Sequence, residues 1–243
     1  MKIIKLNAID STNSYLKEMA QNSALENLTV VVTNNQQKGR GQVANKWFSE
    51  PFKNLTFSVF TNGFELDIKD QKYLNFAVSL AIYQTLFAHK TPNLSIKWPN
   101  DIMSASKKIC GILIENSIKG TKITSSIIGI GLNVNQEKFP DALKKATSLK
   151  NCTNAEFDLD TLLIELIENL KKTIQILCLK KYQKLETGYL NVLYKKNIPS
   201  MFKDKNDVLF MGKIIGVSLY GNLQVELDDE TIKEFGVKEI SFV

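Results

Sequence analysis

Two adjacent apolar segments constrain the fold of this chain more than any other feature. They are KKICGILIENS (107–117) and KITSSIIGIGLNVN (122–135), and the short link between them contains Lys119 and Gly120. Segments this rich in β-branched residues predict strands, and a short link with a glycine predicts that the two strands pair as a hairpin. The fold must therefore contain a sheet that includes this pair.

The rest of the first 196 residues alternates between further strands and helices. A helix over 11–22 is indicated by Ser11, which can cap its first turn, and by an apolar stripe at helical spacing. The other expected elements are strands at 28–35, 55–60 and 94–99 and helical segments at 70–89 and 159–185. Together they predict an α+β protein with a mixed β-sheet and packed helices.

The sequence changes character near residue 197. Short strand-like segments then follow one another closely, with turn signals at Gly221-Asn222 and Asp228-Asp229. This pattern predicts a small β-barrel. We therefore expect two domains, 1–196 and 197–243.

The amino-acid composition limits the classes of protein to which this chain can belong. The 243 residues are 44% hydrophobic and 23% charged, which is typical of a globular protein with its own core. The three cysteines lack metal-ligand spacing, no signal peptide is evident, and no apolar run reaches the roughly 18 residues of a membrane span. These features predict a reduced, cytoplasmic protein that does not enter a membrane.

Charge and histidine content exclude further classes of function. The net charge of +6 comes almost entirely from lysines spread along the chain, whereas base readout favours arginine, so a nucleic-acid partner is not expected. The single histidine, His89, rules out a His-Glu-x-x-His metal site. No Gly-x-Ser-x-Gly turn accompanies it to suggest a serine hydrolase.

The stretch QQKGRGQVANKW (36–47) contains the only arginine of the chain, between two glycines. Gly39 and Gly41 permit close approach of backbone N–H groups to a ligand, and Arg40 adds a planar fork of donors. One interpretation is a cradle for a phosphate or carboxylate, and the other is a plain turn. An arginine in a lysine-dominated chain favours the cradle.

Three more motifs combine polar groups with glycine. In KWPND (97–101), Asn100 and Asp101 follow a strand, where they could hold Mg²⁺ or orient a ligand, or simply form an Asx turn. In KKICGILIE (107–115), Lys108 could reach a phosphoryl group, or it could be a solvated strand residue. In GIGLNVN (129–135), alternating glycines leave one strand face bare for a flat ligand or for close packing.

These motifs and DSTN (10–13) occur in the order DSTN, QQKGRGQVANKW, KWPND, KKICGILIE and GIGLNVN. In this order they resemble those of the biotin–protein ligase family. The resemblance implies a class II synthetase-like catalytic domain followed by an SH3-like β-barrel. It also implies an ATP-dependent enzyme that forms biotinyl-5′-adenylate and then transfers biotin to a lysine of a biotin carboxyl carrier protein, with Mg²⁺ accompanying ATP.

The resemblance also assigns roles to residues. Biotin-binding roles fall on Ser11, Thr12, Asn13, Gln36, Gly39, Arg40, Gly41, Lys108, Gly111, Leu113 and Gly129. ATP-binding roles fall on Arg40, Trp47, Asn100, Lys108, Gly131 and Asn133. Arg40 and Lys108 would be catalytic, and Asp101 would hold the metal.

The sequence departs from the family pattern in the loop. Gln42 and Asn45 stand where many members carry arginine, which predicts weaker ATP binding and a steep Mg²⁺ dependence. DSTN begins at Asp10, which leaves no room before it for a DNA-binding winged helix, so operator binding is not expected. Lipoate–protein ligase is the closest enzymatic alternative, and a binding module without turnover is another. A homodimer formed through an exposed strand is left open.

Overall fold

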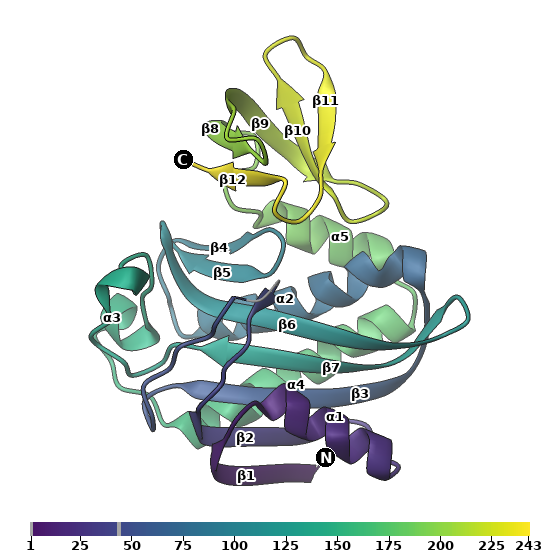
Figure 1. Cartoon of the computed structure of the whole chain (residues 1–243), viewed down its shortest axis with the longest axis vertical. Coiled ribbons are helices and arrows are strands. Elements are labelled where there is room, and N and C mark those ends of the chain that lie inside the picture. Colours follow the sequence, from purple (N-terminus) through teal and green to yellow (C-terminus); the bar gives the residue numbers. More distant parts are fainter. Residues whose placement is uncertain (1, 43–44) are drawn as a thin grey trace.

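The computed structural model describes residues 2–42 and 45–243, which form two β-sheets (Figure 1). The larger sheet has seven strands in the order β1-β2-β3-β7-β6-β5-β4. Their bounds are β1 Lys2–Ile9, β2 Thr29–Gln36, β3 Leu55–Asp67, β4 Leu94–Lys97, β5 Asp101–Ser104, β6 Lys107–Lys119 and β7 Lys122–Leu132. β1 and β2 run parallel and the other neighbours antiparallel, so the predicted mixed sheet is confirmed.

The predicted hairpin lies in the middle of this sheet. β6 and β7 pair antiparallel from Cys110↔Leu132 to Lys119↔Lys122, and Gly120 turns the chain with a φ of 61°. A positive φ is the conformation that glycine adopts without steric cost. β3 pairs along the other side of β7. The three longest strands are therefore neighbours and form a rigid floor.

Helices cover the two faces of the sheet unequally (Figure 1). Helix α1 (Thr12–Asn22) lies on one face, where Leu16 packs against Val31, Phe60 and Ile127. The larger hydrophobic core lies on the other face, under α2 (Gln71–Ala88) and α4 (Leu159–Cys178). Because α1 is short, part of its face remains available for a ligand.

The structure corrects several expected bounds. The helical segment predicted at 159–185 is two helices, α4 and α5 (Tyr182–Asn191), because Lys180 takes a φ of 51° that no α-helix accommodates. β3 is longer than expected, and β4 and β7 end earlier. Sequence analysis missed β1, β5, the short helix α3 (Leu149–Thr153), and the 3₁₀ turns η2 (Ile68–Asp70) and η3 (Asp141–Leu143).

The C-terminal residues form a second, antiparallel sheet in the order β11-β10-β9-β8-β12. Its strands are β8 Pro199–Asp204, β9 Leu209–Val217, β10 Leu223–Leu227, β11 Ile232–Phe235 and β12 Ile240–Phe242. Both predicted turns are present, and the sheet fits the expected SH3-like module. It also touches the main body, since Trp98 Nε1 donates to the Gly221 carbonyl at 3.0 Å. The domain division at 197 stays a prediction.

Membrane insertion was not expected from the sequence. Within the described part of the chain, no helix has both the length and the apolar character needed to span a bilayer.

Candidate functional site

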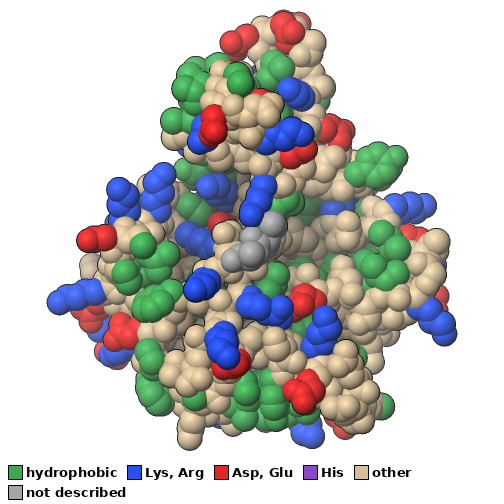
Figure 2. Space-filling view, in the orientation of Figure 1, with side chains coloured by type: hydrophobic (Ala, Val, Ile, Leu, Met, Phe, Trp, Pro, Cys, Tyr) green, Lys and Arg blue, Asp and Glu red, His purple; other side chains and the backbone are tan. Residues whose placement is uncertain are grey.

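A cavity of about 560 Å³ lies on the α1 face of the large sheet. Its floor comes from β6 and β7, and its walls come from the start of α1, the loop at 36–47, the KWPND segment and the C-terminal sheet. Figure 2 shows several Lys and Arg side chains around the centre of this face, where the main body meets the C-terminal sheet.

Most of the residues predicted from the sequence line this cavity. They are Ser11, Thr12, Asn13, Gln36, Arg40, Gly41, Trp47, Asn100, Asp101, Lys108, Gly111, Leu113, Gly129 and Gly131. Gly39 and Asn133 lie outside the lining. The structure thus brings together motifs from five separate stretches of sequence, while the ligand roles of these residues stay predictions.

The central positions of the cavity floor carry no side chains, because glycines occupy them. Gly111 and Gly131 are paired across β6 and β7, and Gly129 pairs with Leu113 on the same face. The Trp47 indole lies against Gly131, where a Cβ would overlap it, and a Cβ on Gly111 would come within 3.1 Å of the same ring. Glycine in these strands therefore permits a flat group to contact the backbone.

Gly39 acts on the loop rather than on the cavity. The Trp47 amide donates to the Gly39 carbonyl at 3.0 Å, and the Gly41 amide donates to the Asn45 carbonyl at 2.7 Å. A Cβ on Gly39 would overlap the carbonyl oxygen of Trp47. These contacts join residues 39–41 to residues 45–47 and place Arg40 at the cavity.

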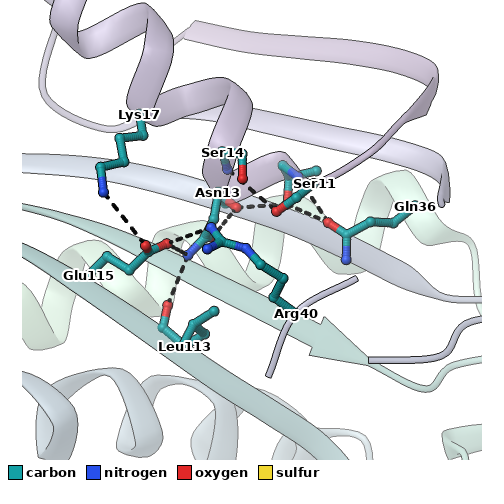
Figure 3. A network of polar contacts seen from close by, with 10 residues as sticks. Ser11, Asn13, Ser14, Lys17, Gln36, Arg40, Leu113 and Glu115 are labelled. Carbon is teal, nitrogen blue, oxygen red and sulfur yellow. Dashed lines mark hydrogen bonds and ion pairs between the residues drawn. The ribbon is translucent and has the colours of Figure 1, made fainter. Parts of the chain in front are cut away.

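A buried polar cluster forms one end of the cavity (Figure 3). The Gln36 side-chain oxygen accepts from the Thr12 amide at 2.9 Å and from the Thr12 hydroxyl at 3.2 Å. Ser58 Oγ lies 2.7 Å from Thr12 Oγ1 and donates to Asn13 Oδ1 at 2.5 Å. Ser58 is fully buried on β3 and was missed in the sequence, where only its place in an alternating strand could have pointed to it.

The orientation of the Asn13 amide follows from its partners. Asn13 Nδ2 donates to the Leu113 carbonyl at 3.3 Å and to Glu115 Oε2 at 2.7 Å. Since a carbonyl and a carboxylate can only accept, the nitrogen must face them and the oxygen must face Ser58. Both ends of Asn13 are thus engaged by protein, so it orders the cluster instead of leaving an amide free for a ligand.

The lining of the cavity is also rich in cations. Among the described residues, one acidic side chain, Asp101, lines the cavity together with five basic ones, which are Arg40, Lys46, Lys97, Lys108 and Lys238. Lys108 Nζ lies 2.6 Å from Asp101 Oδ1 and 5.6 Å from the centre of the Trp47 ring. The excess positive charge favours a polyanionic ligand.

Lys97, on β4, is a lining cation with little support from neighbouring side chains. Its Nζ lies 5.1 Å from the centre of the Phe242 ring on β12, and it forms no hydrogen bond or ion pair within residues 2–42 and 45–243. Burial lowers the pKa of Lys97, and the nearby Lys145, Lys108 and Lys195 lower it further, while Asp101 raises it. An anion in the cavity would stabilise the charged form of Lys97 and so offset the effect of burial on its pKa. Sequence analysis gave Lys97 no role.

The residues do not fit a resident metal site. Of the described lining residues, Asp101 alone carries a carboxylate, and its Oδ1 already pairs with Lys108. Across the described ranges, no three His, Cys, Asp or Glu side chains gather closely enough to hold an ion. Mg²⁺ prefers near-octahedral oxygen ligands, so Asp101 alone is a poor match for the predicted role.

Two predicted ATP ligands are engaged in the scaffold. The Asn100 side chain donates to the Ile112 carbonyl at 2.7 Å and so ties KWPND to β6. The Asn133 side chain is buried and donates to the Thr147 carbonyl at 3.0 Å. Both amide nitrogens therefore have structural partners, and their predicted roles toward ATP remain untested.

Comparisons with known proteins agree with this geometry. The family model of the biotin/lipoate A/B protein ligase family matches residues 6–133. The chain is 35% identical over 159 residues to "Bifunctional ligase/repressor BirA" of Bacillus spizizenii, which covers 64% of this chain and 48% of that protein. It is 28% identical over 170 residues to "Biotin--[acetyl-CoA-carboxylase] ligase" of Mycobacterium tuberculosis, covering 68% of this chain and 60% of that protein.

The chain thus spans about half the length of the BirA proteins it matches. Among solved structures, "Biotin protein ligase from Aquifex aeolicus in complex with biotin and ATP" superimposes with a TM-score of 0.81 at 27% identity, covering 100% of this chain and 98% of that chain. Because the family model matches more than half of this chain, the chain belongs to the biotin/lipoate A/B protein ligase family.

Proposed function

We propose that this protein is a biotin–protein ligase. It forms biotinyl-5′-adenylate from biotin and ATP and then transfers biotin to a lysine of a biotin carboxyl carrier protein. The observation that carries this proposal is the polarity of the cavity, whose lining combines an ordered uncharged cluster with an excess of cations. Biotin has a polar ring and an anionic tail, and ATP adds a polyphosphate beside that tail.

The polar cluster accounts for recognition of the ring. The Gln36 oxygen is held by Thr12, which leaves the Gln36 amide nitrogen facing the cavity without an acceptor among residues 2–42 and 45–243. That nitrogen can donate to the carbonyl of the ureido group. The Gly111, Leu113 and Gly129 surface offers an apolar wall for the rest of biotin.

The first step joins two anions. An oxygen of the biotin carboxylate attacks the α-phosphorus of ATP, a P–O bond forms, and pyrophosphate leaves. Arg40 and Lys108 reduce the repulsion between the carboxylate and the phosphate and hold them in line. Lys46 and Lys97 also line the cavity, and their positive charges can neutralise the polyphosphate. Mg²⁺ enters bound to ATP, as part of that substrate.

The second step consumes the mixed anhydride. The uncharged amine of the carrier lysine attacks the biotinyl carbonyl, an amide forms, and AMP leaves with the anhydride oxygen. The described parts of the loop, 36–42 and 45–47, contribute to the cavity lining, so they can limit access of water to the adenylate before the carrier arrives. The carrier's identity, a homodimer, the absence of operator binding and a cytoplasmic location stay predictions.

Calorimetric titration with biotin and with lipoate tests the proposal, followed by measurement of biotin-dependent pyrophosphate release from ATP. We expect biotin to bind and lipoate to bind weakly, because the lipoate ring offers no group that matches the polar cluster. Preference for lipoate would assign the chain to the other branch of its family. Binding of biotin without pyrophosphate release would identify a binding module without turnover.

A further inference from the structure

Glu115 lies outside the cavity lining and has no role in the proposed reaction so far. It follows Leu113 on the cavity face of β6, because residues two apart along a strand point to the same side. Its side chain is 26% exposed and lies beneath α1 (Figure 3). Glu115 thus stands where the cavity floor ends.

Three donors, two from α1 and one from the loop, converge on this carboxylate (Figure 3). Asn13 Nδ2 and Arg40 Nη2 both reach Oε2, at 2.7 and 3.3 Å. Lys17 Nζ lies 4.0 Å from Oε1. Asn13 and Lys17 are four residues apart and so project from one side of α1, while Arg40 arrives from the loop.

The Arg40 guanidinium has few other restraints. It belongs to a loop whose two arms are joined mainly by backbone hydrogen bonds, and its side chain is 47% exposed. A flexible cation with five donors can adopt many orientations in such a place. The contact with Glu115 uses one edge of the fork and leaves the others available to the cavity that Arg40 lines.

Asn13 connects this contact to the polar cluster. Its nitrogen bonds Glu115, and its oxygen accepts from Ser58, whose oxygen lies 2.7 Å from the Thr12 hydroxyl. A continuous set of hydrogen bonds therefore runs from Gln36, in the uncharged cluster, to Arg40, a cation of the cavity lining.

We propose that Glu115 is a positioning residue, which fixes the guanidinium of Arg40 at the end of the cavity floor and, through Asn13, ties its position to the Thr12–Gln36 cluster. This inference deepens the proposed function, on which its catalytic consequence rests. Glu115 touches neither substrate. It acts by reducing the number of orientations that Arg40 must lose when the two anions bind.

The first test follows Arg40 directly by NMR and needs no activity. Arg40 is the only arginine of the chain, so its Nε–Hε resonance is unambiguous. We expect a lower heteronuclear NOE at this group in Glu115→Ala and an intermediate value in Glu115→Gln, whose amide oxygen can still accept. The matched control is Glu226→Gln, because Glu226 has a similar exposure of 31% and pairs with Lys213 in the other sheet.

The second test measures adenylate formation by pyrophosphate release. We expect Glu115→Ala to raise the KM for biotin and ATP about tenfold, because an anchor of a charge-assisted hydrogen bond is lost, and Glu115→Gln to recover part of the loss. In an Arg40→Ala background, Glu115→Ala should add less than about twofold, since a residue that acts through Arg40 has nothing left to position.

The outcomes separate this inference from the proposed function. An unchanged Arg40 resonance and NOE in Glu115→Ala would overturn the inference. So would a rise in KM of about tenfold when Glu115→Ala is added to Arg40→Ala, because the two residues would then act independently. A wild-type protein that orders Arg40 through Glu115 yet releases no pyrophosphate would refute the ligase and leave the positioning contact intact. Thermal unfolding of each variant identifies any change that comes from lost folding.

Discussion

The two ends of the cavity differ in how completely the protein satisfies its own polar groups. At the uncharged end, Thr12, Asn13 and Ser58 are buried and bonded to one another or to Gln36. At the charged end, within the part of the chain that the structure describes, Lys97 contacts an aromatic ring but forms no ion pair, and Lys108 pairs with the lining carboxylate of Asp101. The polar groups of one end are paired within the protein, whereas the cations of the other end leave charge that an anionic ligand would neutralise.

This difference suggests a division of labour. A prearranged set of hydrogen bonds selects a ligand by shape and polarity, because any mismatch leaves a buried group without a partner. Excess cations attract anions at long range and respond to salt and pH. Changes at the uncharged end should therefore alter which acid is bound, and changes at the charged end should alter how well nucleotide binds and reacts.

The largest expected effect tests the charged end. Lys108→Met should slow adenylate formation about 100-fold or more, because it removes a cation from the place where charge develops. Lys107→Met is the matched control, since Lys107 is exposed and lies outside the cavity lining. Single-turnover measurement with saturating ATP distinguishes slow chemistry from weak binding. An equal loss in both variants would contradict the assignment.

A second change tests the uncharged end. Ser58→Ala should weaken biotin binding about tenfold, because Asn13 Oδ1 loses its partner and the cluster loosens. Calorimetry gives the affinity, and chemical unfolding should show a loss of about 1–3 kcal/mol in the free energy of unfolding.

Ser126→Ala is the control for this change. Ser126 is also buried in the large sheet and donates to an asparagine, Asn116, at 2.7 Å, but it lies outside the cavity lining. It should lose comparable stability while biotin affinity stays unchanged. Equal losses of affinity in the two variants would mean that Ser58 contributes to folding alone.

A third change tests whether the positive charge of Lys97 contributes to ATP binding. Lys97→Met should raise the KM for ATP about fivefold, because a partly buried ammonium near the polyphosphate is lost. Lys233→Met is the control, since Lys233 lies 5.3 Å from the Phe235 ring but outside the cavity.

The pH dependence of Lys97 has a definite sign. Its pKa is lowered in the free protein, so it loses its charge earlier than an ordinary lysine as pH rises. ATP binds the charged form better, so the KM for ATP should increase on the alkaline side. Lys97→Arg keeps its charge over this range and should give a flatter profile. Identical profiles for the two proteins would exclude Lys97 from nucleotide binding.

The smallest effect concerns the loop. Gln42 and Asn45 line the cavity, so the double change Gln42→Arg and Asn45→Arg would add two cations to its charged end. We expect the KM for ATP to fall about threefold and its dependence on Mg²⁺ to become less steep. A Mg²⁺ titration of both proteins measures this, and an unresponsive wild-type KM would refute the predicted Mg²⁺ dependence.

Local chemistry explains which parts of the fold could be predicted. Ser11 caps α1 as expected, and its side chain accepts from the Ser14 amide, because capping depends on residues three apart. The β6–β7 hairpin was predictable because strand propensity and turn meet within a short range. The break at Lys180 and the short strand β5 were missed, because few residues signal them and tertiary contacts decide them.

The candidate site was predictable where a motif is contiguous. A few neighbouring residues indicate unusual backbone or side-chain chemistry in three such stretches, 39–41, 100–108 and 129–131. Ser58 and Glu115 carry no such signal. Their importance arises from Asn13, which is 45 residues from one and 102 from the other.

The α+β class, the central hairpin, the glycine positions without side chains and the unusual place of the one arginine could all be predicted from the sequence. These follow from propensity, alternation and spacing, which act over short stretches of chain. The pairing of Lys108 with Asp101, the contact of Lys97 with the Phe242 ring and the pairing of Arg40 with Glu115 depended on the folded structure. Such pairings depend on distances between segments far apart in sequence, and those distances are set by the packing of the whole sheet.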